Sequence, residues 1–222
     1  MENASKPAVL FDWDGVLIDS SRQHEESWEL LAAENGFKLP NGHFKRGFGM
    51  KNEAILSELL AWTNEPAEML RISLRKEELY RELVTRRGVT ALPGSREFLD
   101  RLKAAGIPCA IGSSTHRLNI VTCLGMLGMN GYFSAIISAE NVRRGKPDPE
   151  VFLEAAKALQ TPAHHCIVFE DAQVGIEAAL RGGMKVVGVA GTHPKETLTA
   201  AHRVVVRLDE LVPADLTALI GA

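Results

Sequence analysis

Residues 9–21 read VLFDWDGVLIDSS, and this stretch decides the fold. An apolar run ends abruptly in two aspartates, Asp12 and Asp14, which are separated by a single residue and are followed by Gly15. A short, continuous apolar run is typical of a strand that is covered on both faces, as in a parallel sheet. Such sheets bind their ligands beyond the carboxyl ends of the strands. The two aspartates therefore stand where a functional site is expected.

Five further apolar runs of this kind follow along the chain: IPCAIG (107–112), AIIS (135–138), CIVF (166–169), VVGVA (186–190) and the weaker RVVV (203–206). Segments with helical spacing of apolar residues separate them, at residues 95–106, 149–160 and 174–183. Repeated strand–helix–strand units predict an α/β fold with a doubly wound parallel sheet.

One region interrupts this alternation. Residues 20–89 contain several helix-like stretches and no convincing strand, and the sequence VTALPGS (89–95) supplies a turn where the chain returns to the sheet. We therefore expect a core domain formed by residues 1–19 and 90–222. A small all-helical domain, residues 20–89, is expected as an insert after the first strand.

Composition narrows the possible functions. The 222 residues include 45% hydrophobic and 24% charged residues, which is ordinary for a globular protein, and the net charge of −3 speaks against a nucleic-acid surface or a polybasic membrane patch. No apolar stretch approaches the roughly 18 residues of a membrane span, and no secretory signal pattern opens the chain. The three cysteines are odd in number and widely spaced, which favours buried thiols in a reducing compartment. We expect a cytoplasmic monomer or weak homodimer without nucleic-acid or membrane partners.

Polar side chains follow the carboxyl ends of other predicted strands as well. They are Ser113 and Ser114 after IPCAIG, Lys146 in the loop after AIIS, and Glu170 and Asp171 after CIVF. Together with the first two aspartates, these carboxylates, a hydroxyl and an ammonium group are typical of a hard divalent cation beside a phosphate. Carboxylates this close would repel one another unless a cation compensated them. Mg²⁺ together with Lys146 would balance the charge.

Each of these features has a simpler explanation when taken alone. The DxDG segment could be a turn or a calcium loop, Lys146 a solvated loop lysine, and Ser113 or the pair at 170–171 a helix cap. The calcium loop fails because glycine stands at its fourth position rather than its sixth, and Gln23 occupies position twelve. The occurrence of all four features at strand ends favours a single site.

Four motifs, taken in order, carry a resemblance to a known family. DWDGV (12–16), IGSS (111–114), GKPDPE (145–150) and FEDAQVGIEAA (169–179) resemble the motifs of the haloacid-dehalogenase-like superfamily, and the match covers essentially the whole chain. With its helical insert, the chain is similar to the subfamily of phosphatases and β-phosphoglucomutase-like enzymes. The resemblance implies a Rossmann-like core and a helical cap domain.

The resemblance also implies roles for the strand-end residues. Asp12 would be the nucleophile and Asp14 the general acid and base, while Ser113 and Lys146 would hold the transferring phosphoryl group. The reaction would be hydrolysis of a small phosphorylated metabolite, such as a sugar phosphate, through an aspartyl-phosphate. The presence of Asp14 argues against dehalogenation, since family members acting on carbon–halogen bonds lack this second acid.

For the metal, the resemblance implies Mg²⁺ held by Asp12, the backbone carbonyl of Asp14 and Asp171, with Glu170 near it.

The helical insert is expected to close over the site and to select the substrate. The candidate substrate-binding residues are His24, Lys51, Asn52 and Lys76 in the insert, and Ser114 in the core. His24 and Lys76 resemble cap residues of β-phosphoglucomutase, although a solvated helix face would explain them equally well. Asn52 stands where a mutase-like alignment has an arginine, with Lys51 next to it.

These observations favour a Mg²⁺-dependent phosphatase. A phosphohexomutase of the β-phosphoglucomutase type is the alternative among enzymes, and a catalytically silent binding protein that kept the fold is the alternative from another class.

Overall fold

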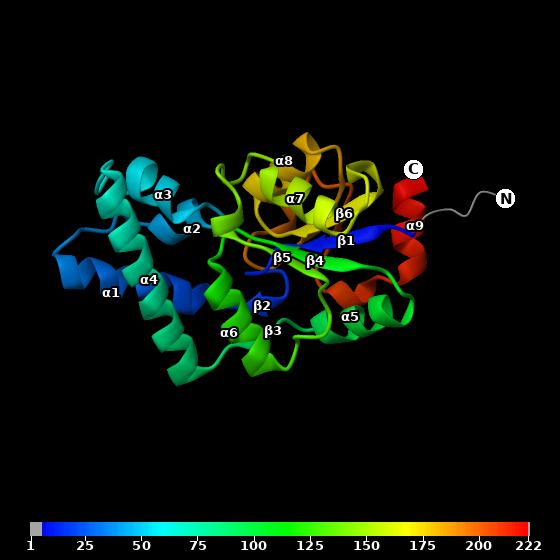
Figure 1. Ribbon diagram of the computed structural model, residues 1–222, viewed down its shortest axis with the longest axis horizontal. Helices are drawn as coiled ribbons and strands as arrows, with labels where there is room; N and C mark the ends of the chain where they lie inside the picture. The colour runs from blue at the N-terminus through cyan, green and yellow to red at the C-terminus, as the bar shows by residue number, and fades with distance from the viewer. Residues whose placement is uncertain (1–5, 222) are drawn as a thin grey trace.

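Six parallel strands form the central sheet of the computed structural model, which describes residues 6–221 (Figure 1). The strands are β1 (Ala8–Phe11), β4 (Cys109–Gly112), β5 (Ala135–Ile137), β6 (Cys166–Glu170), β7 (Lys185–Val189) and β8 (Arg203–Val205). Their order in the sheet is β5-β4-β1-β6-β7-β8, so the chain winds outward from β1 in both directions. All six predicted strands and the doubly wound parallel sheet are confirmed.

The first strand is the centre of the fold because both of its faces are buried. Val9 and Phe11 point into one apolar cluster, and Ala8 and Leu10 point into the other. All four residues are inaccessible to solvent. Continuous rather than alternating apolarity in the sequence reflects this burial on both faces.

Helices cover the two faces of the sheet. On the face of Phe11 lie α5 (Ser95–Ala104), α6 (Arg117–Leu127) and α9 (Pro213–Gly221). The opposite face is covered by α7 (Glu150–Ala158) and α8 (Gln173–Arg181). Short 3-10 helices occur in the connections: η2 (Ala139–Asn141), η3 (Ala163–His165), η4 (Lys195–Thr197) and η5 (Leu208–Glu210).

A second group of helices lies at one end of the molecule, to the left in Figure 1. It consists of α1 (Ser21–Asn35), α2 (His43–Gly47), α3 (Asn52–Ala54), the π-helix η1 (Ile55–Leu59) and α4 (Pro66–Arg87). These helices enclose their own apolar cluster, which includes Trp28, Leu31, Leu56, Ile72 and Leu79. We call this group the cap helices and the remainder of the described chain the core.

Two short antiparallel strands flank the cap helices. They are β2 (Ile18–Asp19) and β3 (Thr90–Ala91), and they pair with each other where the chain leaves the core and where it returns. The sequence analysis did not predict these strands. Residues 1–5 and 222, which the expected core domain includes, lie outside the described residues.

Two expectations from composition can be compared with the fold. Cys109, Cys123 and Cys166 are buried free thiols, as predicted. Within residues 6–221, no helix combines the length and the apolar character needed to cross a membrane.

Candidate active site

Asp12 directly follows the last residue of β1, and the chain then enters the turn at Gly15. Its backbone NH donates to the carbonyl of Phe169 on the neighbouring strand at 2.9 Å, which fixes the aspartate at the edge of the sheet. Lys146 Nζ donates to Asp12 Oδ1 at 2.7 Å and to Glu170 Oε1 at 2.5 Å. All three side chains are buried, so the ammonium group compensates two carboxylates away from solvent.

Three carboxylates gather around this position. Oxygen atoms of Asp12, Glu170 and Asp171 lie within 4.8 Å of one another. Burial raises the pKa of Asp12 to about 7 against the opposing effect of Lys146. Burial also raises the pKa of Asp171 well above its usual range, with further contributions from Glu170 and Asp12. Lys146 supplies a single positive charge, so the three carboxylates can be ionised together only if a further cation compensates them.

The residues at this position fit a hard divalent cation. Both carboxylate oxygens of Asp171 are buried without a hydrogen-bond partner in the described part of the chain, which is costly unless another group approaches them. Gly15 has a φ of +80°, and a Cβ at this residue would overlap the Asp171 carboxylate. The oxygen-only donor set is the one that Mg²⁺ prefers. The side chain of Asp14 is not part of this cluster.

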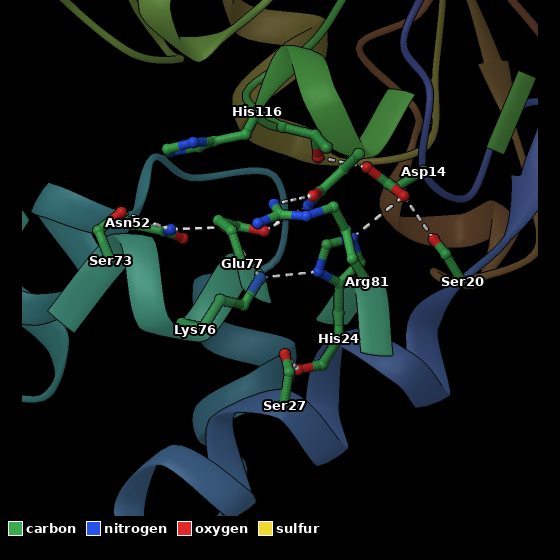
Figure 2. Close-up of polar contacts among 12 residues, drawn as sticks. Asp14, Ser20, His24, Ser27, Asn52, Ser73, Lys76, Glu77, Arg81 and His116 are labelled. Carbon is green, nitrogen blue, oxygen red and sulfur yellow. Dashed lines mark hydrogen bonds and ion pairs between the residues drawn. The ribbon is translucent and has the colours of Figure 1, made fainter. Parts of the chain in front are cut away.

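The carboxylate of Asp14 has a different set of neighbours (Figure 2). Its Oδ1 accepts from Ser20 Oγ at 2.5 Å and contacts His24 Nε2 at 3.2 Å, and its Oδ2 accepts from Thr115 Oγ1 at 2.5 Å. Burial alone would raise the pKa of Asp14, but His24 and the two hydroxyls outweigh it and lower the pKa to about 2. Asp12 and Asp14 thus sit two residues apart with opposite pKa shifts.

The two serines after β4 lie in different surroundings. Ser113 is buried at the end of the strand, where its hydroxyl accepts from the backbone NH of Thr115 at 3.2 Å. Ser114 Oγ donates to the carbonyl of Gly49 in the cap helices at 2.8 Å. Ser114 therefore connects the core to the cap helices as well as facing the site.

A pocket between the core and the cap helices brings these groups together. Its lining from the core includes Asp12, Asp14, Ser113, Ser114 and Thr115. The polar lining from the cap helices includes His24, Asn52, Lys76 and Glu77. The apolar lining includes Trp28, Phe44, Phe48, Met50 and Ile55. The pocket therefore has a charged floor in the core and a largely apolar cover.

His24 and Lys76 do not form a solvated helix face, because both are buried in this pocket. Lys76 Nζ lies 2.8 Å from His24 Nδ1 and donates to Glu77 Oε1 at 3.1 Å. The ring of His24 stacks on Tyr80 with 3.9 Å between the ring centroids. Asn52 is also buried and donates to Glu77 Oε1 at 2.6 Å. The structure thus places three of the four predicted cap residues in one hydrogen-bonded network.

The fourth predicted cap residue, Lys51, lies outside this network. Its ammonium group donates to the carbonyl of Val142 at 3.0 Å, and its side chain packs beside Gly145 in the loop that leads to Lys146. It does not line the pocket. The next residue along the chain, Asn52, begins α3 and turns inward instead.

Four residues of the site were missed by sequence reasoning: Ser20, Thr115, Glu77 and Asn119. Of these four residues, only Glu77 could have been recognised from a pattern in the sequence. It lies on α4 among positions 72, 73, 76, 79, 80 and 83, which share the buried face of that helix, so a charged residue there had to find a partner. Ser20 and Thr115 are short polar residues outside the helices and strands, and nothing in the sequence pattern marks their contact with Asp14. The contact of Asn119 depends on how the cap helices meet the core.

Comparison with known proteins identifies the family of the chain. The family model described as haloacid dehalogenase-like hydrolase matches residues 6–183. The chain is 43% identical over 214 residues to 5-amino-6-(5-phospho-D-ribitylamino)uracil phosphatase, chloroplastic, of Arabidopsis thaliana. That match covers 95% of this chain and 57% of the relative, so the chain spans little more than half of that protein.

Two further proteins resemble the chain over most of both lengths. Validoxylamine A 7'-phosphate phosphatase of Streptomyces hygroscopicus subsp. limoneus is 30% identical, over 91% of this chain and 94% of the relative. The crystal structure of β-phosphoglucomutase from Clostridium difficile superposes with a TM-score of 0.84 at 27% identity, and covers 97% of each chain. Both phosphatases and a mutase are thus among its relatives.

Proposed function

The chain belongs to the haloacid dehalogenase-like hydrolases, and we propose that it is a Mg²⁺-dependent phosphatase acting on a small phosphorylated metabolite. One observation carries the proposal: two aspartates two residues apart face one pocket in opposite electrostatic settings. Asp12 lies against Lys146 and the other acidic residues, while Asp14 is held by Ser20, His24 and Thr115. Different settings for two carboxylates are what separate roles in catalysis require.

We propose a division of the chain into a core domain, residues 1–19 and 90–222, and a cap domain, residues 20–89. The separate apolar cluster of the cap helices and the β2–β3 pair at their base support this division. The pocket lies between the two parts, so the cap would exclude water from the reacting groups when it is seated.

In the first step, a carboxylate oxygen of Asp12 would attack the phosphorus atom of the substrate and form an aspartyl-phosphate. The bond between phosphorus and the leaving oxygen breaks, and Asp14 supplies the proton that this oxygen needs. In the second step, water attacks the aspartyl-phosphate while Asp14 takes up a proton from it. The bond from phosphorus to Asp12 breaks, and inorganic phosphate is released.

Asp14 must hold a proton in the first step, although its pKa is lowered to about 2 by His24 and its other donors. A substrate dianion next to this carboxylate would raise the pKa by like-charge repulsion. Once Asp14 has given this proton to the leaving oxygen, it is a carboxylate and can accept a proton from the attacking water. The same contacts thus support both of its roles.

The remaining residues of the floor would bind the phosphoryl group. Lys146 and Ser113 would hold the phosphoryl oxygens. Asp12, Asp171 and the backbone carbonyl of Asp14, with Glu170 near them, would hold Mg²⁺, whose chemistry in such a site is to offset negative charge on the phosphoryl oxygens.

A mutase of the same family is the alternative, and the charge of the cap argues against it. A mutase must hold a second phosphate in the cap, for which arginine is the suited residue. Lys76 is the one lysine or arginine among the described lining residues, and it is already bonded to Glu77 and His24. Asn52 carries no charge. A bisphosphate would therefore meet no free cation on the cap side.

The pocket also bears on the substrate. Its apolar cover suits a phosphate ester whose remaining part is uncharged, and a flat ring would pack against Trp28, Phe44 or Phe48. We include the ribitylaminouracil phosphate named for the Arabidopsis relative among the candidate substrates. A cytoplasmic location, a monomer or weak homodimer, and the absence of nucleic-acid and membrane partners stay predictions; the Arabidopsis relative is described as chloroplastic.

The first test is hydrolysis of p-nitrophenyl phosphate with Mg²⁺ by the parent protein and by Asp12→Asn. The amide cannot act as the nucleophile, so turnover should be lost while the fold is kept. Asp19→Asn, at an exposed position of the same segment, is the matched control and should retain turnover. Phosphate release by Asp12→Asn at the parent rate would refute the role of Asp12. An inactive parent protein would favour the silent binding protein.

A second test separates phosphatase from mutase. β-Glucose 1-phosphate is supplied with a catalytic amount of the 1,6-bisphosphate, and both glucose 6-phosphate and free phosphate are followed. Phosphate release without isomer supports the phosphatase, whereas isomer formed much faster than phosphate would establish the mutase. A screen of phosphorylated metabolites, with phosphate release as the readout, then identifies the substrate.

A further inference from the structure

One buried carboxylate of the cap helices, Glu77, faces the core rather than the reacting groups. Its Oε1 accepts from Asn52 Nδ2 at 2.6 Å and from Lys76 Nζ at 3.1 Å, and its Oε2 accepts from Asn119 Nδ2. Asn119 belongs to α6, which packs on the central sheet. Glu77 therefore joins a cap helix to a core helix through a buried charge.

A chain of hydrogen bonds leads from Glu77 to Asp14 (Figure 2). Lys76 bonds to Glu77 and to His24 Nδ1, and His24 Nε2 bonds to Asp14 Oδ1. An ammonium group only donates, so Nδ1 of His24 must accept from Lys76, and Nε2 carries the hydrogen that is donated to Asp14. The orientation of the His24 ring, and with it the contact to Asp14, depends on where Lys76 is held.

The charge of Glu77 is what holds Lys76 in place. Burial would raise the pKa of Glu77, but Lys76, His24, His116 and the amide of Asn52 outweigh it and lower the pKa to about 2. Arg81, which lies on α4 like Glu77, donates through Nη1 to Asn119 Oδ1 at 2.9 Å, which turns the Asn119 amide so that its NH₂ group faces Glu77. Each of the three groups bonded to the carboxylate, Asn52, Lys76 and Asn119, is therefore a donor.

We propose that Glu77 is a positioning residue that couples the seating of the cap on the core to the orientation of Asp14, and this rests on the phosphatase function proposed above. Asn119 reaches Glu77 only when α4 lies against α6. Without Asn119, the carboxylate loses one of its three donors and holds Lys76 less firmly. The hydrogen bond from His24 to Asp14 is then no longer fixed. Ser20 and Thr115 hold the Asp14 carboxylate from the core in either arrangement, whereas His24 adds its hydrogen bond in a fixed orientation only when the cap is seated.

The test uses two aryl phosphates that differ in how much they need a proton donor. Phenyl phosphate releases phenol, which has a pKa of about 10, like the tyrosine side chain, and needs protonation by Asp14. 2,4-Dinitrophenyl phosphate releases a far weaker base that leaves without a proton. If Glu77 acts through Asp14, Glu77→Gln should lower kcat/KM for phenyl phosphate about 10- to 100-fold, a part of the roughly 100- to 10,000-fold that general acid catalysis contributes. For 2,4-dinitrophenyl phosphate the loss should stay below about 3-fold, because the donor contributes little there.

The two outcomes that contradict the proposal are clear. Equal losses with both aryl phosphates mean that Glu77 only maintains the structure, and unchanged rates with both mean that it has no role in Asp14 orientation. If the parent protein hydrolyses neither compound, the phosphatase function is wrong and this inference falls with it. A parent that hydrolyses both, with a variant that loses them equally, refutes the inference alone.

Two further variants complete the design. Asn119→Leu keeps the size of the side chain but removes the hydrogen-bond donor on the core side. It should lower the rate for phenyl phosphate and not the rate for 2,4-dinitrophenyl phosphate. This variant also tests the proposal if Glu77→Gln fails to fold. A parent-like ratio of the two rates in Asn119→Leu would refute the coupling to cap seating. Glu78→Gln is the matched control, because Glu78 is the next residue on α4, is exposed and pairs with Arg75. It should leave both rates unchanged.

Discussion

Replacing Lys146 with methionine tests how much its ammonium group stabilises the fold by compensating the buried carboxylates of Asp12 and Glu170. Lys146 is inaccessible to solvent, and it bonds Asp12 at 2.7 Å and Glu170 at 2.5 Å. Methionine keeps most of the volume, so the variant leaves two buried carboxylates uncompensated beside Asp171. Removing one partner of a buried ion pair costs about 3–5 kcal/mol, and we expect a loss of this size in the free energy of unfolding in EDTA.

The assay is urea unfolding of both proteins, with EDTA and with excess Mg²⁺. A cation that binds the acidic floor should stabilise the Lys146→Met variant more than the parent, because the variant has more uncompensated negative charge to offset. Lys157→Met is the matched control: Lys157 is exposed and pairs with Glu154, and its loss should change the free energy by less than about 1 kcal/mol. A loss below about 1 kcal/mol for Lys146→Met in EDTA would refute the reasoning.

Three further predictions follow from the same geometry. Gly15→Ala should lose nearly all turnover while remaining folded, as measured by phosphate release and circular dichroism, because a Cβ there would overlap the Asp171 carboxylate in a backbone conformation with φ of +80°. Turnover should vanish in EDTA and return with Mg²⁺, while Ca²⁺ should inhibit, since it takes more ligands in looser geometry; full activity in chelator would exclude a metal from the reaction. Above pH 4.5, the free energy of unfolding in urea should be larger for the parent than for Glu77→Gln by about 3 kcal/mol, because folding lowers the pKa of Glu77 from 4.5 to about 2. This difference should shrink as the pH falls toward 2, since the carboxylate is then protonated in the folded protein as well. A difference independent of pH between 7 and 3 would contradict this.

The fold was largely predictable because strands that are buried on both faces appear in the sequence as continuous apolar runs. Each strand of the sheet is a short apolar run, and the predicted runs match β1, β4 and β6 to within a few residues. The pair β2 and β3 was not predictable, since strands of two residues are too short to show any periodicity. Their pairing depends on the cap helices bringing residues 19 and 90 together.

The floor of the site could also be derived from the sequence, for a topological reason. In a parallel sheet, the residue that follows each strand lies at the same edge, whatever the sequence separation. Lys146 and Asp12 are 134 residues apart and still form an ion pair. Strand ends therefore predict the meeting of these side chains without any knowledge of how the helices pack.

The cap side could not be derived in this way. Lys51 and Asn52 are neighbours, and which of them enters the pocket depends on the start of a helix of three residues. The contact between Glu77 and Asn119 depends on how α4 lies against α6, which no periodicity in either helix records. Sequence reasoning therefore derived the floor residues from their positions after strands, whereas it missed Glu77 and Asn119, which meet where α4 lies against α6.

The two sides of the pocket also differ in how their charge is balanced, and this difference suits a monophosphate. In the core, the single positive charge of Lys146 faces the carboxylates of Asp12, Glu170 and Asp171, so a divalent cation would be needed to complete the balance. In the cap, Lys76 and Glu77 neutralise each other, and Asn52 adds only dipoles. With a divalent cation bound, the core would attract a phosphoryl group, while the cap would offer hydrogen bonds and apolar contact to a neutral remainder of the substrate. The ester of the proposed reaction would therefore bind with its phosphorus toward Asp12, because the cap side of the pocket has no net charge to attract a phosphate.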